Sequence, residues 1–199
     1  MAELKKEQAK QLIDSARRSI KLFFSDKSIE AWESKEEWLN EKQGVFVTLQ
    51  TYPGRELRGC IGFPYPTLPL GKAIAEAAKL SAFEDTRFPP LIEDEIDKIT
   101  IEISVLTKPQ EIKNAQKSDV IKDVEVGKDG LIVEYSGYSG LLLPQVATEE
   151  EWNSEHFLEQ TCIKAGISPK SWKNKTCRIY KFQAQIFSEE KPNGKIAIK

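Results

Sequence analysis

Residues 44–63 read GVFVTLQTYPGRELRGCIGF, two runs of alternating side chains on either side of a proline and a glycine. The first run, 44–50, places valine or leucine at every second position, and the second, 57–63, alternates in the same way. Alternation with a period of two predicts β-strands with one apolar face. The Tyr-Pro-Gly-Arg sequence at 52–55 predicts a turn. The stretch therefore predicts a β-hairpin.

The number of residues in that turn decides which face of the hairpin carries Cys60. An odd loop places Arg58 and Cys60 on the second face, beside Thr48 and Gln50, and places Leu57 on the apolar face. An even loop reverses the assignment, because a shift of one residue exchanges the two faces. We favour the odd loop, since three-residue loops with glycine are common and a Pro-Gly type II turn suits a two-residue hairpin poorly.

Periodicity also predicts the other elements. Helical spacing of apolar residues predicts helices over 6–24 and 71–83 with a connector over 28–40, and alternation predicts strands over 99–106, 131–135, 139–143 and 177–187. Thr148 and Glu151 form a capping box, which predicts a helix that starts there and runs to Ala165. Gly166 suits its end. The tail after Pro192 is expected to be peripheral.

These elements predict an α+β fold. Helices lie at both ends of a set of antiparallel strands, and regular βαβ alternation is missing. The length of 199 residues and the hydrophobic content of 40% suit a single domain over 1–199. We expect a mainly antiparallel sheet flanked by helices, with at least one polar sheet face that is covered or forms a cleft.

Composition narrows the function classes. A net charge of -2 gives no global attraction to nucleic acid. The sequence has no run of about 18 apolar residues, and its first residues lack the apolar segment of a secretory signal. It also has no Walker loop or dinucleotide fingerprint. These features predict a soluble cytoplasmic protein that does not bind a membrane.

The three cysteines, Cys60, Cys162 and Cys177, have no metal-ligand spacing, and their odd number cannot form a complete disulfide framework. We therefore expect reduced thiols and no metal site.

The ordered set of motifs along the chain resembles the AMMECR family. The matching segments are Gly44–Leu49, Leu57–Gly62, Asp85 with Arg87–Leu91, Ile101–Leu106, Gly140–Ala147, Trp152 and Lys164–Gly166. The resemblance covers most of the chain. It implies a compact α+β domain with two unequal lobes and a biochemical activity that is not settled.

Microbial relatives of this family are often encoded beside, or fused to, Memo-like proteins and radical S-adenosylmethionine proteins. The resemblance thus implies a pathway shared with those proteins. The chain has no CxxxCxxC motif, so it cannot itself be the radical enzyme.

Cys60 is the residue with the clearest chemical potential. Gly59 and Gly62 on either side of it leave the backbone open to a ligand or to another segment. The alternative for these glycines is that they only permit a β-bulge. The guanidinium of Arg58, two residues away on a strand, would lower the pKa of the thiol and make it a nucleophile. The alternative is that Cys60 is a small buried apolar residue.

Other polar residues join Cys60 in a candidate ligand site. The whole set is Arg58, Gly59, Cys60, Gly62, Asp85, Arg87, Glu102, Ser104 and Gln145. Under the odd-loop register, Glu102 and Ser104 share the second sheet face, and Asp85 and Arg87 reach it from the linker after the second helix. A structural ion-pair network is the alternative for Asp85 and Arg87. Gln145 is either a ligand contact or a turn stabiliser.

Three functions remain open. The first is an accessory domain that binds a small polar ligand or a protein partner around Arg58 and Cys60. The second is an enzyme in which Cys60 is a nucleophile or redox thiol, with the only histidine, His156, as its base. The third and weakest is nucleic-acid association through a lysine cluster: Lys170, Lys173 and Lys175. The sequence names no cofactor.

Overall fold

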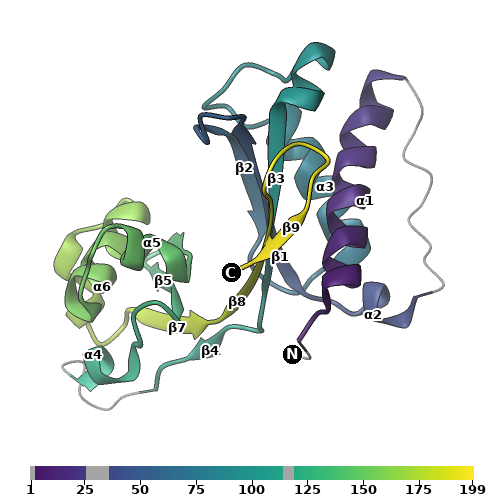
Figure 1. Ribbon diagram of the computed structural model, residues 1–199. Helices are drawn as coiled ribbons and strands as arrows, with labels where there is room; N and C mark the ends of the chain where they lie inside the picture. Colours follow the sequence, from purple (N-terminus) through teal and green to yellow (C-terminus); the bar gives the residue numbers. More distant parts are fainter. Residues whose placement is uncertain (1–2, 26–35, 114–118) are drawn as a thin grey trace. The chain divides into compact units, whose positions relative to one another are not determined.

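The computed structural model describes residues 3–25, 36–113 and 119–199, which form two compact units (Figure 1). The first unit comprises Met1–Leu106 with Gln185–Lys199, and the second comprises Thr107–Ala184. Both combine helices with an antiparallel sheet, which confirms the predicted α+β class. The assignment of 1–199 to a single domain stays a prediction.

The first unit is built on a five-stranded sheet with the strand order β2-β1-β3-β8-β9. Its elements are α1 (Lys6–Phe24), α2 (Glu37–Asn40), β1 (Gly44–Thr51), β2 (Leu57–Phe63), α3 (Leu70–Phe83), the 3₁₀ helix η1 (Glu93–Lys98), β3 (Ile99–Leu106), β8 (Ala184–Glu189) and β9 (Ile196–Ile198). Figure 1 shows α1 and α3 on the same side of this sheet. The predicted bounds of α1, β2 and β3 are confirmed, and those of β1 and α3 differ by one residue at one end.

The core of the first unit lies between the sheet and these two helices. Helix α1 buries one stripe at helical spacing, which includes Leu12, Ala16 and Ile20. On the sheet, fully buried residues at every second position, such as Val47 on β1 and Ile103 on β3, belong to the same core. One sheet face is therefore apolar and covered by helices, so the alternate residues on the same strands project from the opposite face.

A β-bulge decides the register of the β1–β2 hairpin. Near the turn Gln50 pairs with Leu57, but beyond the irregularity Leu49 pairs with Gly59 and Thr48 pairs with Cys60. The bulge absorbs Arg58 as an extra residue. Gln50 and Leu57 pair across an even number of residues, so the odd loop that we favoured is wrong at the turn. The bulge shifts the register by one residue, and Cys60 therefore still lies opposite Thr48, on the second face as predicted. Leu57, expected on the apolar face, is instead 43% exposed, because the register shift comes after it.

The second unit has its own sheet and core. Its sheet has the order β4-β7-β5-β6. The elements are β4 (Gln110–Glu111), α4 (Val120–Asp123), β5 (Gly130–Tyr135), β6 (Tyr138–Leu142), α5 (Pro144–Glu149), α6 (Ser154–Lys164), the 3₁₀ helix η3 (Pro169–Lys173) and β7 (Arg178–Phe182). Phe157 and Trp172 are fully buried in its core. The predicted hairpin of β5 and β6 is confirmed, and it turns through Ser136 and Gly137, both at positive φ.

The helix predicted from Thr148 to Ala165 is wrong. Thr148 lies inside α5, and α6 is a separate helix capped by Asn153, whose side chain accepts the N–H of His156 at 2.8 Å. Pro144 occupies the first turn of α5, where its missing N–H costs nothing. Glu151, at φ 55°, interrupts the helical path between them. The prediction failed because a capping-box pattern occurred by chance within a helix.

The last predicted strand, 177–187, is wrong in its extent. Its residues form two strands, β7 and β8, which belong to different sheets. The tail after Pro192 is not merely peripheral, since β9 pairs with β8 and buries Ile196. Most of the connector predicted at 28–40 lies outside the described residues, which begin again at 36. In the described part of the chain, no helix has the length and apolar character needed to cross a membrane.

Candidate functional site

The centre of the candidate site is a row of three polar side chains across three strands. Thr48 on β1 pairs with Cys60 on β2 and with Glu102 on β3. Residues directly opposite in antiparallel strands project from the same face. The three side chains therefore lie side by side on the sheet face opposite α1 and α3. The Thr48 hydroxyl donates a hydrogen bond to Cys60 Sγ at 3.2 Å.

Asp85 and Arg87 hold the peptide groups of Cys60. A carboxylate oxygen of Asp85 accepts the N–H of Cys60 at 2.8 Å, and the guanidinium of Arg87 donates to the carbonyl of Cys60 at 3.0 Å. The two side chains also pair with one another at 2.7 Å. Strand β2 ends the described order of its sheet, so these side chains satisfy backbone groups that would otherwise be open to another strand. The predicted approach of Asp85 and Arg87 to Cys60 thus takes place at its backbone.

The thiol of Cys60 is not activated by its surroundings. Burial raises its pKa, and neither the hydrogen bond from Thr48 nor the positive charge of Arg87 offsets that increase. The expectation that a neighbouring cation moves this pKa toward neutrality is therefore wrong, and the cation that acts on it is Arg87 rather than Arg58. Cys60 is nevertheless partly exposed, whereas Cys162 and Cys177 are buried, and all three are free thiols.

Helix α3 reaches into the strand pair beside Cys60 through Ser81. The Ser81 hydroxyl accepts the N–H of Ile61 at 2.8 Å and donates to the carbonyl of Val47 at 2.8 Å, so it bridges β1 and β2. Gly59 makes this approach possible, because a Cβ there would lie 2.0 Å from the carbonyl oxygen of Ser81. The space beside Gly59 is filled by the protein itself.

Gly62 and Ser104 lie in the next row of the same face. Both pair with Phe46 on β1. A Cβ on Gly62 would lie 2.4 Å from the Phe46 ring, so this glycine also serves packing. Ser104 is 1% exposed. The two residues frame the row of Thr48 and Cys60 without offering an open surface.

Arg58 is turned toward the segment before β3. Its guanidinium donates to both carboxylate oxygens of Glu95, each at 2.9 Å, and to the carbonyl of Pro89 at 2.8 Å. This pairing lowers the pKa of Glu95. Arg58 itself is buried. Its contacts show it fixing the linker to the edge of the sheet.

Glu102, the third member of the row, is 7% exposed and is paired with Lys199, whose ammonium group lies 2.6 Å from the carboxylate. Lys199 follows β9, which lies two strands away from β3 in the sheet order. The row thus presents a hydroxyl, a thiol and a carboxylate bound to an ammonium group, all of which form hydrogen bonds.

The remaining candidates belong to the second unit. Gln145 lies in the first turn of α5, and its buried Oε1 has no hydrogen-bond partner in the described part of the chain. His156, on α6, lies 3.2 Å from the Gln160 amide and 3.6 Å from Glu159. The structure does not bring Gln145 or His156 together with the Cys60 row in one unit.

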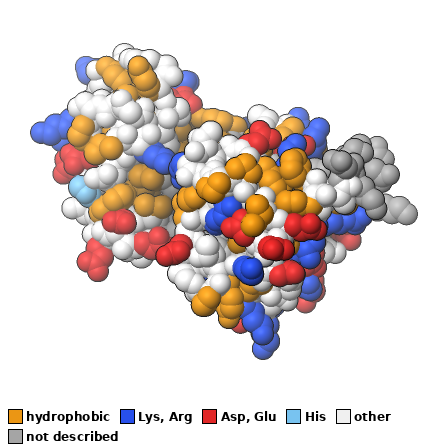
Figure 2. All heavy atoms as spheres, turned by 90° about the horizontal axis from the view of Figure 1, so that it is seen from above, with side chains coloured by type: hydrophobic (Ala, Val, Ile, Leu, Met, Phe, Trp, Pro, Cys, Tyr) orange, Lys and Arg blue, Asp and Glu red, His pale blue; other side chains and the backbone are white. Residues whose placement is uncertain are grey.

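The lysine cluster on the second unit is partly neutralised. Lys173 pairs with Glu155 at 3.0 Å and lies over the Trp172 ring. Figure 2 shows Lys and Arg side chains interspersed with Asp and Glu on the face drawn. Among the described residues, no three His, Cys, Asp or Glu side chains are grouped so that they could hold a metal ion.

Two residues near Cys60 were not among the candidates drawn from the sequence. Thr48 was expected beside Cys60 but not as its hydrogen-bond partner. The sequence does indicate that Ser81 is buried, because it lies three and four positions after Ala78 and Ala77, on the buried stripe of an alanine-rich helix. A buried serine needs a hydrogen-bond partner, and here it finds two.

Comparison with known proteins decides the family. The family model described as AMMECR1 matches residues 13–187. The chain belongs to the AMMECR1 family. Protein MJ0810 of Methanocaldococcus jannaschii is 46% identical over 181 residues, which are 91% of this chain and 90% of that protein. Protein PYRAB00100 of Pyrococcus abyssi is 46% identical over 200 residues, 98% of this chain and 97% of that protein.

The fold of this AMMECR1 chain also has a solved relative. The crystal structure of the uncharacterized protein PH0010 from Pyrococcus horikoshii matches with a TM-score of 0.92 at 46% identity, and the match covers 98% of each chain. The predicted resemblance to the AMMECR family is thereby confirmed. These AMMECR1 relatives carry names that state no activity, so the chemistry of the site rests on its own residues.

Proposed function

We propose that this AMMECR1-family chain is an accessory protein that binds a small polar ligand at the Cys60 row, defined as Thr48, Cys60 and Glu102. One observation carries the proposal: three side chains of different hydrogen-bonding character lie in register on the sheet face that α1 and α3 leave uncovered. Polar ligands are held by a few convergent hydrogen-bonding groups of this kind.

Rigidity of the row supports a binding role. Asp85 and Arg87 fix the peptide of Cys60, and Ser81 joins its strand, β2, to the neighbouring strand β1. A site whose groups are already ordered costs less entropy when a ligand binds. Residues such as Arg58, which the sequence placed in the ligand set, act in this proposal as supports rather than contacts.

Hydrogen-bonding chemistry points to the ligand class. The thiol is protonated at neutral pH, because burial raises its pKa, and the Glu102 carboxylate is already paired with Lys199. The row therefore offers neutral donors and acceptors together with one compensated charge. Such a row suits an uncharged ligand with hydroxyl or amide groups, or an extended segment of a partner protein.

Affinity capture from cell extract tests the proposal. The full chain and the variants T48V and C60S would be immobilised, and bound metabolites and proteins identified by mass spectrometry. The matched control is Ser139→Ala, an exposed position on β6. A species retained by the wild type and the control but lost from both variants supports the proposal. Equal retention by all four proteins, with folding intact, overturns it.

Cys60 catalysis is the second candidate function. It is favoured by the partial exposure of this cysteine alone among the three and by the nearby charge of Arg87. The raised pKa of the thiol weighs against it, because the thiolate is the nucleophile. In the affinity-capture experiment, Memo-like and radical S-adenosylmethionine proteins are the first partners to look for, and cytoplasmic extract is the first material to use.

A further inference from the structure

A second hollow, apart from the Cys60 row, lies between the start of α1 and the connection from β8 to β9. It encloses about 510 Å³, and its lining includes Lys6, Glu7, Lys10, Lys191, Asn193 and Lys195. Figure 1 shows the connection, drawn in yellow, beside α1. A volume of this size lies within the range of small-molecule sites, which is roughly 300–1,000 Å³.

Positive charge gathers around this hollow. Its lining includes four lysines and only one carboxylate, that of Glu7, in a chain whose net charge is -2. Lys10 is paired with Asp14 at 2.8 Å, but Lys6, Lys191 and Lys195 have no carboxylate partner among the described residues. Like charges brought together repel one another, so an anion between them would stabilise the arrangement.

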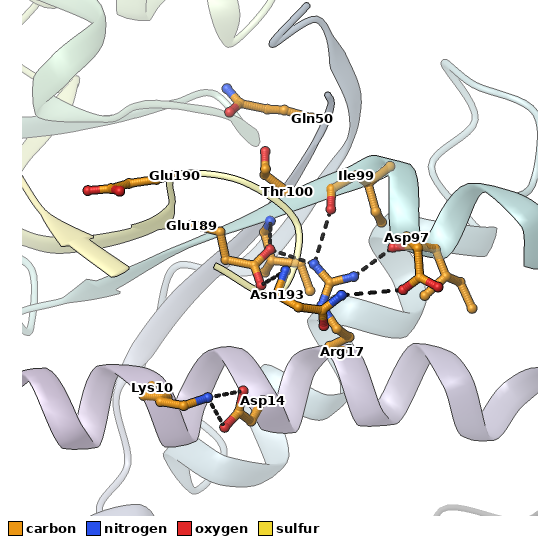
Figure 3. Close-up of polar contacts among 12 residues, drawn as sticks. Lys10, Asp14, Arg17, Gln50, Asp97, Ile99, Thr100, Glu189, Glu190 and Asn193 are labelled. Carbon is orange, nitrogen blue, oxygen red and sulfur yellow. Dashed lines mark hydrogen bonds and ion pairs between the residues drawn. The ribbon is translucent and has the colours of Figure 1, made fainter. Parts of the chain in front are cut away.

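Contacts of Glu189 and Asn193 fix the β8–β9 connection, which forms one wall of the hollow. Glu189, at the end of β8, is 2% exposed and pairs with the buried guanidinium of Arg17 on α1. Its other carboxylate oxygen accepts the N–H of Asn193 at 3.2 Å, and the Asn193 amide donates to Asp97 at 3.3 Å. Figure 3 shows Arg17, Glu189 and Asn193 facing one another. The lysines therefore extend from a fixed backbone.

Flanking carboxylates set a limit on the size of the anion. Asp14 lies one turn beyond Lys10 on α1, and Glu190 directly precedes Lys191. Both are exposed, and both would repel a long polyanion that continued past the hollow. Flexible lysine ammonium groups suit phosphate as point charges. The charges and the volume together favour a compact ligand with several phosphate groups.

We propose that the hollow lined by Lys6, Lys10, Lys191 and Lys195 binds a small polyphosphorylated molecule. The ligand contributes two or more adjacent phosphate groups, and the ammonium groups of Lys6, Lys191 and Lys195 neutralise them, while Lys10 is already paired with Asp14. Glu7 opposes the charge of the ligand and limits its affinity. This site is independent of the Cys60 row.

Calorimetric titration of the full chain with inorganic tripolyphosphate tests the inference. The wild type is expected to bind in low-salt buffer and to bind more weakly as salt is added, since exposed charges are screened. K191A/K195A should weaken binding by about tenfold or more, equivalent to about 1.4 kcal/mol. Glu7→Gln should tighten it, an effect of opposite sign that misfolding would not produce.

The matched control is K170A/K175A, which removes two exposed lysines from the second unit. It should leave the affinity unchanged. Absence of binding by the wild type at millimolar tripolyphosphate, or equal weakening by the control, overturns the inference. A single-stranded oligonucleotide that binds more tightly than tripolyphosphate and is weakened by K191A/K195A would also overturn it, because the hollow would then accept a long polyanion.

Discussion

The carboxylate of Asp85 accepts the peptide N–H of Cys60 at 2.8 Å, across 25 residues of sequence. The same carboxylate is paired with Arg87, which returns a hydrogen bond to the carbonyl of Cys60. An ion pair thus occupies both backbone groups of one residue on an edge strand. The motif around Cys60 is stabilised from outside the sheet, and this can be tested directly.

Asp85→Ala should destabilise the fold. The change leaves the N–H of Cys60 without its acceptor and Arg87 without its partner, at a cost of about 1–3 kcal/mol. Asp85→Asn should cost less, because its amide oxygen can still accept the N–H of Cys60. Urea unfolding at neutral pH measures the free energy of unfolding of both variants. Equal stability of Asp85→Ala and the wild type would show that the Asp85 carboxylate does not stabilise the fold.

Acid should remove the contribution of Asp85. The hydrogen bond from Arg87 holds the pKa of this carboxyl at about 2, against 3.8 for an ordinary aspartate. A carboxyl with a lower pKa in the folded chain stabilises the fold above the unfolded value and loses that effect as pH falls through the folded value. The stability gap between wild type and Asp85→Asn should therefore narrow between pH 3.8 and about 2, as followed by thermal unfolding.

Gly59→Ala should be more damaging than its small size suggests. Its Cβ would lie 2.0 Å from the backbone carbonyl of Ser81, which cannot move without shifting α3. We expect a loss of about 3 kcal/mol, at the upper end for an overpacked core. The control is Gly54→Ala on the same hairpin, where the nearest atom would be 3.6 Å away and the change should fall within about 0.5 kcal/mol.

Cys60 should be the only cysteine that iodoacetamide alkylates in the folded chain. Because burial raises its pKa, the midpoint of the rate against pH should lie above that of free cysteine, which is about 8.5. Thr48→Val should raise the midpoint further, since the hydroxyl hydrogen bond lowers this pKa. Mass spectrometry of the alkylated chain, with C60S as the blank, reads the result. A midpoint near neutral pH would instead favour catalysis by Cys60.

Arg17 should be required for the first unit to fold stably. Its guanidinium binds Glu189 and the carbonyls of Ile96 and Ile99, all of them buried contacts. Arg17→Met leaves the Glu189 carboxylate buried and without its cation, which costs about 3–5 kcal/mol. The double variant R17M/E189M should lose less than the sum of the two single losses, as measured by denaturant unfolding. Simple additivity would show that the two residues do not act as a pair.

Local patterns predicted elements best where one periodicity continued without interruption. The stripe of α1 and the alternation of β3 each fixed both ends of the element. The helix expected from Thr148 failed because Pro144 and Asn153 each start a helix of their own, and the capping-box pattern does not compete with them. The prediction of one strand over 177–187 was wrong because the alternation of side chains continues through the point where the chain passes from one sheet to the other.

The candidate site was predictable in its members but not in their roles. The strand pattern and its glycines pointed to Cys60, but the predicted loop parity was wrong, and Thr48 lies beside Cys60 because the bulge shifts the register by one residue. The direction of Arg58 depended on a bulge, which the glycines of the motif permit but do not place at Arg58. The pKa of Cys60 depended on its burial in the folded chain. Only the tertiary structure shows that the space beside Gly59 is occupied by Ser81 of α3 and not left open for a ligand.

The sequence by itself determined the family, the α+β class and the alternating strands, because these follow from local periodicity and from motifs read in order. Tertiary structure alone decided that Asp85 and Arg87 bind the peptide groups of Cys60. It also decided the two ion pairs, Glu102 with Lys199 and Glu189 with Arg17. These contacts join residues distant along the chain, and their geometry depends on register, bulge and packing together. For that reason a thiol that looks activated from its neighbours in sequence is, in the folded chain, a partly exposed and protonated one.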